Sequence, residues 1–421
     1  MESLKGKKLL ILAGAAVHCK VVEAAKELGV YTIVTDYLPD SPAKALADES
    51  WMLNITDVDG IVAKCREEKV DGVLNFCIDP AQRPYVQICK KLGLPCYGTE
   101  EQVRIMTDKP TFKEFCRKHG VDIIPTYTKE DVAQGRVEYP VLVKPVDSRG
   151  SRGITICETD AEMAAAMALA SAESSNGEVI VEKYMGGKQD FSMTYFVVDK
   201  VPYLVRTGDR YLGSKEDRLD KQCIGSMSPS KHSNMYIRHI HPKMLEFIAD
   251  LDISYGPLFM QGFVDGDTVR MYDPGLRFPG TEYERLLSQA TGCDLMKMMV
   301  ELALTGRVET TYKDLTNAYL LRGAHSVQML ISAKPGKIAT FEGIDEIAKD
   351  PRVVIASPRY CTGEEVPNSG DVKQRVCEIV LLICPEDDVK QTLDFVWSKL
   401  KVLNEAGENM LVSRISAERL L

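Results

Sequence analysis

The stretch YPVLVKPVDSRGSRGITIC, residues 139–157, has one lysine before a glycine-containing loop and two arginines within the loop. Alternating apolar residues on both sides of the loop predict two antiparallel strands. The loop itself, residues 146–153, is longer than the about two to five residues of a tight hairpin. Its small residues leave backbone N–H groups accessible, and Arg149 and Arg152 add positive charge. This combination is typical of a phosphate site, with Lys144 on the first strand as a further cation, although a solvated hairpin tip has the same pattern.

A second polar cluster ends a strand in VIVEKYMGGKQDFSM, residues 179–193. The apolar start predicts a buried strand that ends near Glu182, and a Gly-Gly turn then leads to Asp190. One interpretation is a strand that simply ends in polar residues. The other is a hinge whose backbone contacts an adenine edge, with Asp190 bonded to ribose hydroxyls.

A third group lies on a predicted hairpin in LFMQGFVDGDTVRMYDPGLRFPG, residues 258–280. Its Asp-Gly-Asp sequence is typical of a hairpin turn. If the loop is that tripeptide, Gln261 faces Met271, and Asp273 is its diagonal neighbour on the same face, ~7–8 Å away. Arg277 continues the same parity. An amide, a carboxylate and an arginine on one face indicate a site for metal-bound phosphate, and a salt bridge between Asp273 and Arg277 is the alternative.

The elements that position these residues fall into three blocks. Residues 8 to about 107 alternate strand and helix, which predicts a parallel sheet with helices on both faces. In the middle block a helix begins at Lys109, after the candidate caps Thr107 and Asp108, and strands and long loops follow. The last block, from about 308 to 421, predicts a helix, then strands, and a second helix over residues 387–407.

The first predicted strand, KLLILAG, has two competing interpretations. Lysines followed by an apolar run resemble a short signal peptide, but the run passes into an amphipathic helix closed by Gly29 and then a second strand, which favours a strand. Gly14 after this strand and Asp36 at the end of the next suggest a dinucleotide site. Ala15 and Ala16 stand where a GxGxxG motif would continue, so the sequence argues against NAD binding.

Composition limits the class of protein. The chain has 421 residues, of which 45% are hydrophobic and 27% charged, with a net charge of -9. An acidic chain of this kind is not expected to bind nucleic acid or an anionic membrane, and no apolar run approaches the ~20 residues that span a bilayer. The twelve cysteines include no CxxC pair, which favours reduced thiols in a cytoplasmic protein over a disulfide framework.

In this order and spacing, these stretches resemble the ATP-grasp superfamily, in particular its carboxylate–amine ligase and biotin carboxylase-like branch. The last block is similar to that of L-amino acid ligases. The resemblance implies an α/β fold with an α+β core. Its domains would be an open α/β domain over residues 1–107, a nucleotide-binding core over 108–307 with subdomains of about 108–180 and 181–307, and a C-terminal α+β domain over 308–421.

The resemblance also implies ATP and Mg²⁺ as cofactors and assigns residues to them. Lys109 and Lys144 would hold the α- and β-phosphates. The loop residues Ser148, Arg149, Gly150, Ser151, Arg152 and Gly153 would close over the β- and γ-phosphates, and Glu182, Lys183, Tyr184 and Met185 would hold the adenine. Asp190 stands where the family usually has a ribose-binding Glu.

The metal hairpin departs from the family pattern. Where the family usually has a Glu and then a Glu-x-Asn-x-Arg run, this chain has Gln261 and then Asp-Pro-Gly-Leu-Arg, with Gly275 in place of the Asn. Gln261 and Asp273 are the predicted metal ligands, and Mg²⁺ that keeps waters and phosphate ligands needs only one carboxylate. Glu282 or Glu284 would fold back to supply the missing charge.

The resemblance implies an ATP-dependent ligase that activates a small-molecule carboxylate as an acyl phosphate for attack by an amine. Arg277 would stabilise the oxyanion, and Asp209, Arg210 and Ser230 would contact the substrate. A homodimer is compatible with the resemblance. Two alternatives remain open: bicarbonate activation with a separate biotin-bearing partner, and a nucleotide-binding protein whose metal site is degenerate.

Overall fold

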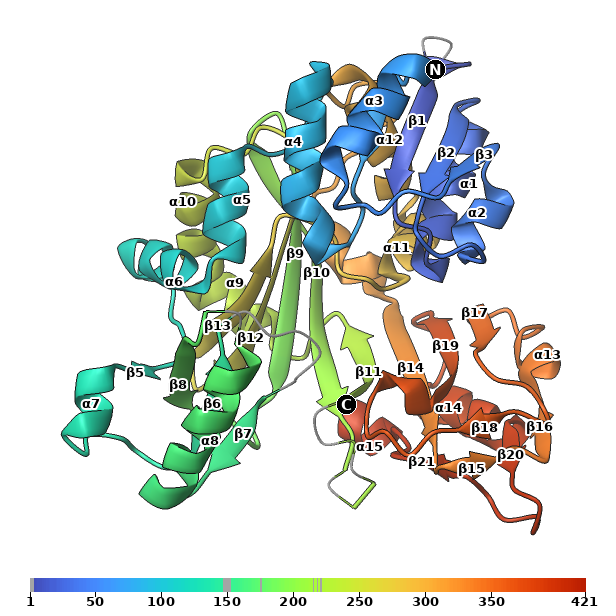
Figure 1. Ribbon diagram of the computed structural model, residues 1–421. Coiled ribbons are helices and arrows are strands. Elements are labelled where there is room, and N and C mark those ends of the chain that lie inside the picture. Colours follow the sequence, from blue (N-terminus) through green and yellow to red (C-terminus); the bar gives the residue numbers. More distant parts are fainter. Residues whose placement is uncertain (1–3, 147–152, 175, 215, 218, 220–221) are drawn as a thin grey trace.

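The computed structural model describes residues 4–146, 153–174, 176–214, 216–217, 219 and 222–421 (Figure 1). Its N-terminal part is a four-stranded parallel sheet in the order β3-β2-β1-β4. The strands are β1 (Lys8–Leu12), β2 (Tyr31–Thr35), β3 (Glu49–Trp51) and β4 (Gly72–Leu74). The helices between and after them are η2 (Ala16–His18), α1 (Cys19–Glu27), α2 (Pro42–Leu46), α3 (Val58–Glu68), η3 (Asp79–Ala81) and α4 (Gln82–Leu92).

The predicted alternation of strand and helix is confirmed in this part, including the strand at KLLILAG. One detail differs: the short strand β3 was not expected. The chain passes from β1 through β2 to β3 on one side and returns to β4 on the other. The carboxyl ends of β1 and β4 therefore flank the point where the strand order reverses, which is where open α/β sheets commonly bind ligands.

Two helices connect this sheet to the rest of the chain: α5 (Glu100–Thr107) and α6 (Lys109–Lys118). α5 begins with a capping box, in which Thr99 and Gln102 satisfy each other's backbone N–H groups. α6 begins at Lys109, and the Asp108 carboxylate accepts the Thr111 N–H at 3.0 Å, as predicted for its cap.

A small antiparallel sheet in the order β5-β8-β6-β7 forms a lobe of its own in Figure 1. Its strands are β5 (Thr126–Tyr127), β6 (Val141–Pro145), β7 (Thr155–Cys157) and β8 (Val179–Lys183), accompanied by α7 (Lys129–Ala133) and α8 (Asp160–Glu173). The two strands predicted on either side of the glycine loop are β6 and β7, and they pair as expected. Val141 and Val143 pack with Met163 of α8, which leaves Lys144 on the other face of the sheet.

A nine-stranded antiparallel sheet runs through the centre of the molecule in the order β13-β12-β9-β10-β11-β14-β19-β17, with β21 also on β14. Its strands are β9 (Asp190–Val198), β10 (Val201–Leu212), β11 (Cys223–Ser228), β12 (Gly256–Asp265), β13 (Thr268–Gly275), β14 (His325–Ala333), β17 (Val353–Pro358), β19 (Arg375–Ile383) and β21 (Leu411–Val412). The pairing of β11 with β14 joins the middle of the chain to its last part in one sheet.

Four helices follow the strands of the middle part: α9 (Ser233–His239), α10 (His241–Asp250), α11 (Tyr283–Thr291) and α12 (Leu295–Thr305). α12 packs on α1 and on β4 of the N-terminal sheet. Gly72 permits this approach, because a Cβ there would lie 2.4 Å from the Ala303 carbonyl oxygen. The N-terminal sheet and the middle of the chain thus share one apolar core, as expected of blocks that pack into one body.

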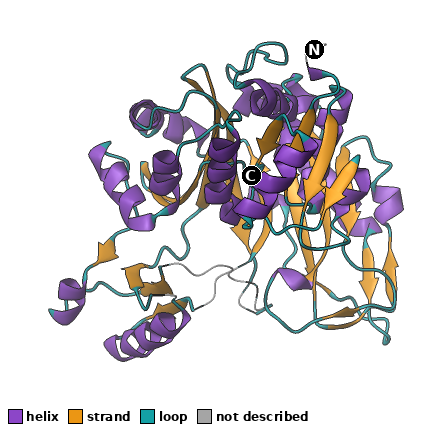
Figure 2. Ribbon diagram, turned by 45° about the horizontal axis from the view of Figure 1, so that its top comes forward, coloured by secondary structure: helices purple, strands orange, loops and turns teal. Residues whose placement is uncertain are grey.

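The last part of the chain adds a second apolar core around β14 and β19. Figure 2 distinguishes the helices, strands and loops of the chain by colour. The remaining elements of this last part are η4 (Ala318–Gly323), β15 (Gly336–Lys337), β16 (Thr340–Glu342), α13 (Ile344–Ile347), β18 (Glu365–Val366), η5 (Val372–Gln374), α14 (Val389–Lys399), β20 (Lys401–Leu403) and α15 (Ala417–Leu420). The helix predicted over 387–407 is too long, because α14 ends at Lys399 and the chain continues as β20, paired with β16.

All twelve cysteines are free, in agreement with the prediction of reduced thiols. Over the part of the chain that the structure describes, no helix has both the length and the hydropathy that a bilayer span requires.

Candidate functional site

Lys109 is a half-buried cation at the first position of α6. Within the described residues its ammonium group makes neither a hydrogen bond nor an ion pair. Burial lowers the pKa of Lys109, and the nearby charge of Lys144 lowers it further, while Asp273 and Glu182 act in the opposite direction. An ammonium group that is partly desolvated and has no counter-ion is suited to bind an anion.

Lys144 is also close to this position, but it already has a carboxylate partner, which it shares with Lys113. Glu182 on β8 is 3% exposed and lies between Lys144, which donates to Oε1, and Lys113, whose Nζ lies 3.3 Å from Oε2. Burial by itself would raise the pKa of Glu182, but the two lysines outweigh it and hold the pKa below its usual value. Lys113 was not predicted, although it is four residues after Lys109 and therefore on the same face of α6.

The predicted adenine segment continues from Glu182 along the end of β8. The N–H groups of Lys183 and Tyr184 donate to the carbonyls of Pro125 and Pro140 at 2.9 and 3.0 Å, and Met185 is buried. Those two N–H groups are therefore already satisfied within the protein. Of the predicted phosphate loop, Ser148, Arg149, Gly150, Ser151 and Arg152 lie outside the described residues. Gly153 has a φ of +67°, and a Cβ there would lie 2.9 Å from the Pro145 ring, so this end of the loop requires glycine.

The predicted metal hairpin is formed by β12 and β13, but its register differs from the expectation. Asp265 pairs with Thr268, so the turn is shorter than the Asp-Gly-Asp tripeptide, and Gln261 pairs directly with Asp273 rather than with Met271. The register shifts next to Gln261, leaving Tyr272 as the extra residue of a β-bulge. Without that bulge Tyr272 would oppose Gln261 and Asp273 would point to the other face of the sheet. The bulge therefore brings the amide and the carboxylate together.

Asp273 is the carboxylate of this hairpin that remains available. No hydrogen bond or ion pair to it is present among the described residues. Burial raises the pKa of Asp273, and the positive charge of Arg277 opposes the rise, with smaller effects of Asp79, Lys109 and Arg210. The described residues contain no group of three or more His, Cys, Asp or Glu side chains able to enclose a metal ion. Asp273 nevertheless fits Mg²⁺, which commonly takes one or two protein carboxylates and completes its shell with phosphate oxygens and water.

Arg277 does not pair with Asp273, so the salt-bridge alternative is wrong. Its guanidinium instead binds both carboxylate oxygens of Asp79, with Nη2 at 2.8 Å from Oδ2, and Nη1 donates to the Phe278 carbonyl at 2.9 Å. Asp79 begins η3, just beyond β4, so Arg277 reaches the reversal point of the N-terminal sheet. A Cβ at Gly275 would lie 3.1 Å from the Arg277 side chain, so the missing Asn of the family pattern leaves room for this arginine.

Arg210 lies on the same face of the large sheet as the hairpin residues. Its Nη1 donates to Asp190 at 2.7 Å and to the Tyr272 hydroxyl at 3.1 Å. The Gln261 amide is satisfied when its oxygen faces the guanidinium, where it accepts from Nε at 3.1 Å and from Nη1 at 2.6 Å. Asp190 is 4% exposed, and burial raises its pKa to about 6 although the charge of Arg210 acts to lower it. The predicted ribose ligand is thus engaged by protein groups on this face.

Asp209 was predicted beside Arg210 at the substrate, and the structure separates the two. They are consecutive residues of β10, so their side chains point to opposite faces of the sheet. Asp209 is 1% exposed and accepts the Ser230 hydroxyl at 2.7 Å and the Lys231 N–H at 3.0 Å. It therefore fixes the chain that follows β11 and does not share the face that carries Asp273.

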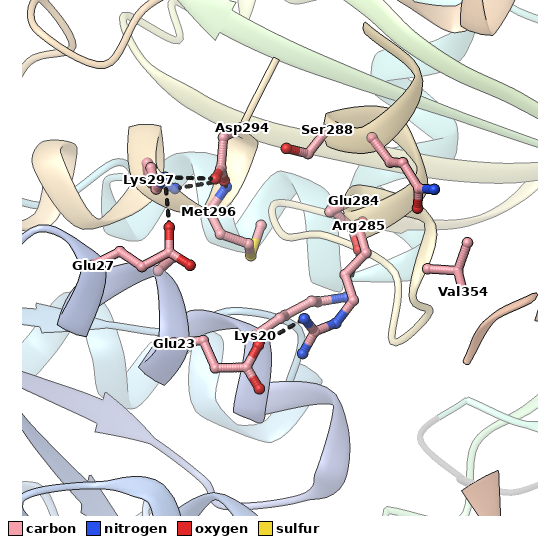
Figure 3. A pocket seen from close by; sticks show the side chains of 12 residues that line it. Lys20, Glu23, Glu27, Glu284, Arg285, Ser288, Asp294, Met296, Lys297 and Val354 are labelled. Atoms are coloured by element: carbon pink, nitrogen blue, oxygen red, sulfur yellow. Dashed lines mark hydrogen bonds and ion pairs between the residues drawn. The ribbon is translucent and has the colours of Figure 1, made fainter. Parts of the chain in front are cut away.

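The expectation that Glu282 or Glu284 folds back to the hairpin is wrong. Glu284 lies 2.6 Å from Lys20 of α1, both side chains being 2% exposed, and Glu282 lies 3.7 Å from the same lysine. Glu284 instead lines a polar cavity of about 400 Å³ (Figure 3). The cavity is lined by Lys20, Glu23, Ala24, Glu27, Glu284, Arg285, Ser288, Gln289, Asp294, Met296, Lys297 and Val354.

Comparison with known proteins agrees with this geometry. The family model described as the ATP-binding domain of the carbamoyl-phosphate synthase L chain matches residues 108–210. The chain is 23% identical over 355 residues to the 2-oxoglutarate carboxylase small subunit of Hydrogenobacter thermophilus, covering 79% of this chain and 72% of that protein. It is 21% identical to the formate-dependent phosphoribosylglycinamide formyltransferase of Bacillus subtilis, over 45% of this chain and about half (51%) of that protein.

Solved structures match over almost the whole chain. Phosphoribosylglycinamide synthetase from Anaerococcus prevotii covers 95% of this chain with all of its own (100%), at a TM-score of 0.74 and 19% identity. L-amino acid ligase from Bacillus licheniformis covers 95% with 99% of its own chain, at a TM-score of 0.77 and 15% identity. The biotin carboxylase domain dimer of the H. thermophilus 2-oxoglutarate carboxylase was solved with MgADP and bicarbonate. The match covers 94% of this chain and 90% of that one, at a TM-score of 0.73 and 18% identity. This chain has the ATP-grasp fold.

The prediction of the ATP-grasp fold is therefore confirmed. The family match contains Lys109, Lys144, Glu182 and the residues from Asp190 to Arg210, but it ends before the metal hairpin. The roles of individual residues in this ATP-grasp protein stay predictions. Sequence reasoning missed three partners in the site, Lys113, Asp79 and Tyr272. Helical spacing would have indicated the first, whereas the other two depend on a contact distant in sequence and on a bulge.

Proposed function

We propose that this ATP-grasp protein is an ATP-dependent ligase that activates a small-molecule carboxylate as an acyl phosphate and transfers it to an amine. The observation that carries the proposal is the set of unpartnered charges around Asp273. Lys109, Asp273 and the outer nitrogen Nη2 of Arg210 have no partner among the described residues, and Asp273 interacts electrostatically with both Lys109 and Arg210. Unpaired charges in a partly buried position are costly unless a ligand completes them.

ATP is the nucleotide that the family match supports, and it would lie between residues 108–180 and 181–307 of the proposed three-domain division. Lys109 would bind the phosphates directly, because its ammonium has no partner in the part of the chain that the structure describes. Lys144 would bind them while remaining paired with Glu182. The end of β8, from Lys183 to Met185, is proposed to hold the adenine.

Asp273 would hold Mg²⁺ beside the phosphates, and the ion would offset the charge of the transferred phosphoryl group. Gln261 does not fit as a ligand in the same way, because its amide oxygen already accepts two N–H groups of Arg210. The hairpin then contributes one charged ligand, and the remaining ligands would be phosphate oxygens and water.

In the proposed reaction, a carboxylate oxygen attacks the γ-phosphorus of ATP, ADP leaves, and an acyl phosphate forms. The amine nitrogen then attacks the acyl carbon and phosphate leaves, after the amine has lost a proton. Negative charge develops on the acyl oxygen, where a fixed guanidinium is stabilising. Arg277 is suited to this role because Asp79 and the Phe278 carbonyl fix its orientation.

Bicarbonate is a second candidate for the activated acid. The similarity to the 2-oxoglutarate carboxylase small subunit, which extends over 79% of this chain, favours it. The chemistry of the phosphoryl transfer would be the same, and the acceptor nitrogen would belong to a separate biotin-bearing partner. One of the similar structures is a dimer, so we also propose that this chain forms a homodimer, which sedimentation velocity tests.

Transfer of ¹⁸O from acid to phosphate tests the proposal. The protein is incubated with ATP, Mg²⁺ and either ¹⁸O-labelled bicarbonate or pooled ¹⁸O-labelled amino acids with unlabelled amines, and the released phosphate is analysed by mass spectrometry. An acyl phosphate transfers one labelled oxygen to phosphate, so we expect label in the amino-acid reaction. Label only from bicarbonate would favour the second candidate. Bound nucleotide with no phosphate released in any mixture would instead identify a degenerate, non-catalytic nucleotide site.

A further inference from the structure

The guanidinium of Arg210 is held rigidly on one side and open on the other. Nη1 and Nε are committed to Asp190, Tyr272 and the Gln261 oxygen. Nη2 has no hydrogen-bond partner within the described part of the chain. The Arg210 side chain is 24% exposed and that of Asp190 only 5%, so the carboxylate that anchors the guanidinium is the more buried of the two. A cation fixed in this way needs no further ordering to bind a ligand.

Arg210 lies near Asp273, because both adjoin Gln261. Each of the two affects the electrostatics of the other, yet no ion pair within 4.0 Å joins them among the described contacts. Asp273 pairs in register with Gln261, which in turn binds the guanidinium, so the order across the sheet is carboxylate, amide, cation. A group that accepts from Nη2 and also bears a metal bound to Asp273 would complete both. A phosphate has the oxygens for both contacts.

The amide oxygen of Gln261 is not available to a metal ion. This oxygen has two lone pairs, and the two N–H groups of Arg210 use both. Since the oxygen is saturated by a cation, a second positive ion next to it would meet electrostatic repulsion instead of a free ligand. The hairpin therefore offers metal coordination at Asp273 alone.

We propose that Arg210 is a permanent cation of the phosphate site, which takes the place of a metal ion at Gln261 and binds a phosphate oxygen of the nucleotide through Nη2. The inference rests on the proposed function, because it assumes that a nucleotide occupies this face. It predicts one divalent cation per bound nucleotide, held at Asp273. It also gives Asp190 the role of a positioning residue, whose carboxylate orients the guanidinium.

Two measurements test this inference on the full-length protein. The first is the affinity for ADP and for adenosine, in Asp190→Asn and in the charge-balanced variant Asp190→Asn/Arg210→Gln. Any contact of Asp190 with the ribose is lost in both proteins, so their difference reports Arg210, and neither variant leaves a buried carboxylate unpaired. We expect ADP binding to weaken about 10- to 100-fold, as for loss of a charge-assisted phosphate contact, and adenosine binding to stay unchanged. The exposed pair Lys200 and Asp252 provides the matched control, Lys200→Gln/Asp252→Asn, which should alter neither affinity.

The second measurement counts Mn²⁺ ions bound at saturating ADP by electron paramagnetic resonance. We expect one ion per wild-type chain. Two ions of similar affinity, or equal loss of ADP and adenosine binding in the charge-balanced variant, would overturn the inference, since the second result indicates only a structural role. Unchanged ADP affinity in that variant would overturn it too. These outcomes differ from failure of the proposed function, in which wild type would bind no ADP.

Discussion

The two sheets that meet at the candidate site treat their charged side chains differently. On the small sheet, Glu182 is buried and forms ion pairs with Lys144 and with Lys113 of α6, so each of these charges has a partner within the protein. On the large sheet, Asp273 has no hydrogen bond or ion pair in the described structure, and Arg210 keeps one nitrogen free. The charged side chains of the first group have partners without a ligand, whereas Asp273 and the free nitrogen of Arg210 do not.

This difference separates charges that stabilise the fold from charges that await a ligand. A buried ion pair makes the free energy of unfolding depend on both partners, because removal of one leaves the other charge unpaired. An unpartnered buried charge does the reverse: it raises the free energy of the folded protein and is compensated when a ligand binds. Substitutions on the small sheet should therefore alter stability, and those at the hairpin should alter ligand binding and turnover.

The largest expected effect on the comparison is from Glu182→Gln, which leaves two buried lysines without a counter-ion. We expect the free energy of unfolding to fall by about 3–5 kcal/mol in urea denaturation at neutral pH. The pKa of Glu182 is lowered in the folded state, so its stabilising contribution is present above the ordinary value of 4.5 and is lost as pH falls through the lowered pKa. The difference between wild type and variant should shrink accordingly in acid. The exposed Glu178→Gln is the control, with a change below about 0.5 kcal/mol.

Asp273→Asn should have the next largest effect, and on turnover in place of stability. If Asp273 is the protein's metal ligand, the rate of ADP formation should fall about 10²- to 10³-fold, as for loss of a major electrostatic contributor to a transition state. The melting temperature should stay the same or rise, because an unpaired carboxylate has been removed. Asp267→Asn, at the exposed tip of the same hairpin, is the matched control. A large fall of the melting temperature in Asp273→Asn would show that Asp273 stabilises the fold, which contradicts the proposed difference between the two sheets.

Lys109 and Lys144 test whether an existing ion pair matters. Both are proposed to bind phosphate, but within the described residues only Lys144 has a partner, Glu182. Lys109→Met should weaken ATP-analogue binding by about 1.5–3 kcal/mol without loss of stability. Lys144→Met should weaken binding by a similar amount and also destabilise the fold, since Glu182 then retains only Lys113. Calorimetric titration and thermal unfolding of both variants measure the two effects. Equal stability of the two variants would show that the pairing of Lys144 has no consequence.

The smallest effect is expected for Gln261→Glu. Sequence reasoning alone predicts tighter Mg²⁺ binding, because the substitution restores a charged ligand. The structure changes that expectation: a glutamate here would form a salt bridge with Arg210, whose Nε and Nη1 already face this side chain. We expect the affinity for Mg²⁺ in the presence of ADP to change by less than about 0.5 kcal/mol. An increase of tenfold or more would mean that the glutamate turns to the metal instead.

The sequence was sufficient where a feature depends on neighbours along the chain. Alternating apolar residues predicted β6 and β7, and Asp108 predicted the start of α6 at Lys109. The site itself depends on contacts that no local pattern contains. The bulge at Tyr272 sets the face of Asp273, and Arg277 binds Asp79, which is 198 residues away in the chain.

Some errors have the same physical origin. Asp209 and Arg210 are adjacent in sequence, and only their placement in one strand separates their side chains to two faces of a sheet. Glu284 was expected at the hairpin because it lies close to it in the chain, yet its partner is Lys20, on a helix of the N-terminal sheet. Proximity in sequence was a poor guide in both cases, because long-range packing decides which charges meet.

Asp273 is proposed to hold a metal ion beside the phosphates of a bound nucleotide. Calorimetric titration of ADP with and without Mg²⁺ is the most direct test of this role. In wild type, Mg²⁺ should tighten ADP binding by about tenfold or more, since an ion shared by Asp273 and the phosphates adds about 1.4 kcal/mol or more. In Asp273→Asn, ADP should bind as it does to wild type without Mg²⁺, and addition of Mg²⁺ should give little further gain. If Mg²⁺ tightens ADP binding equally in both proteins, the hairpin does not hold the metal, and the proposed role of Asp273 is wrong.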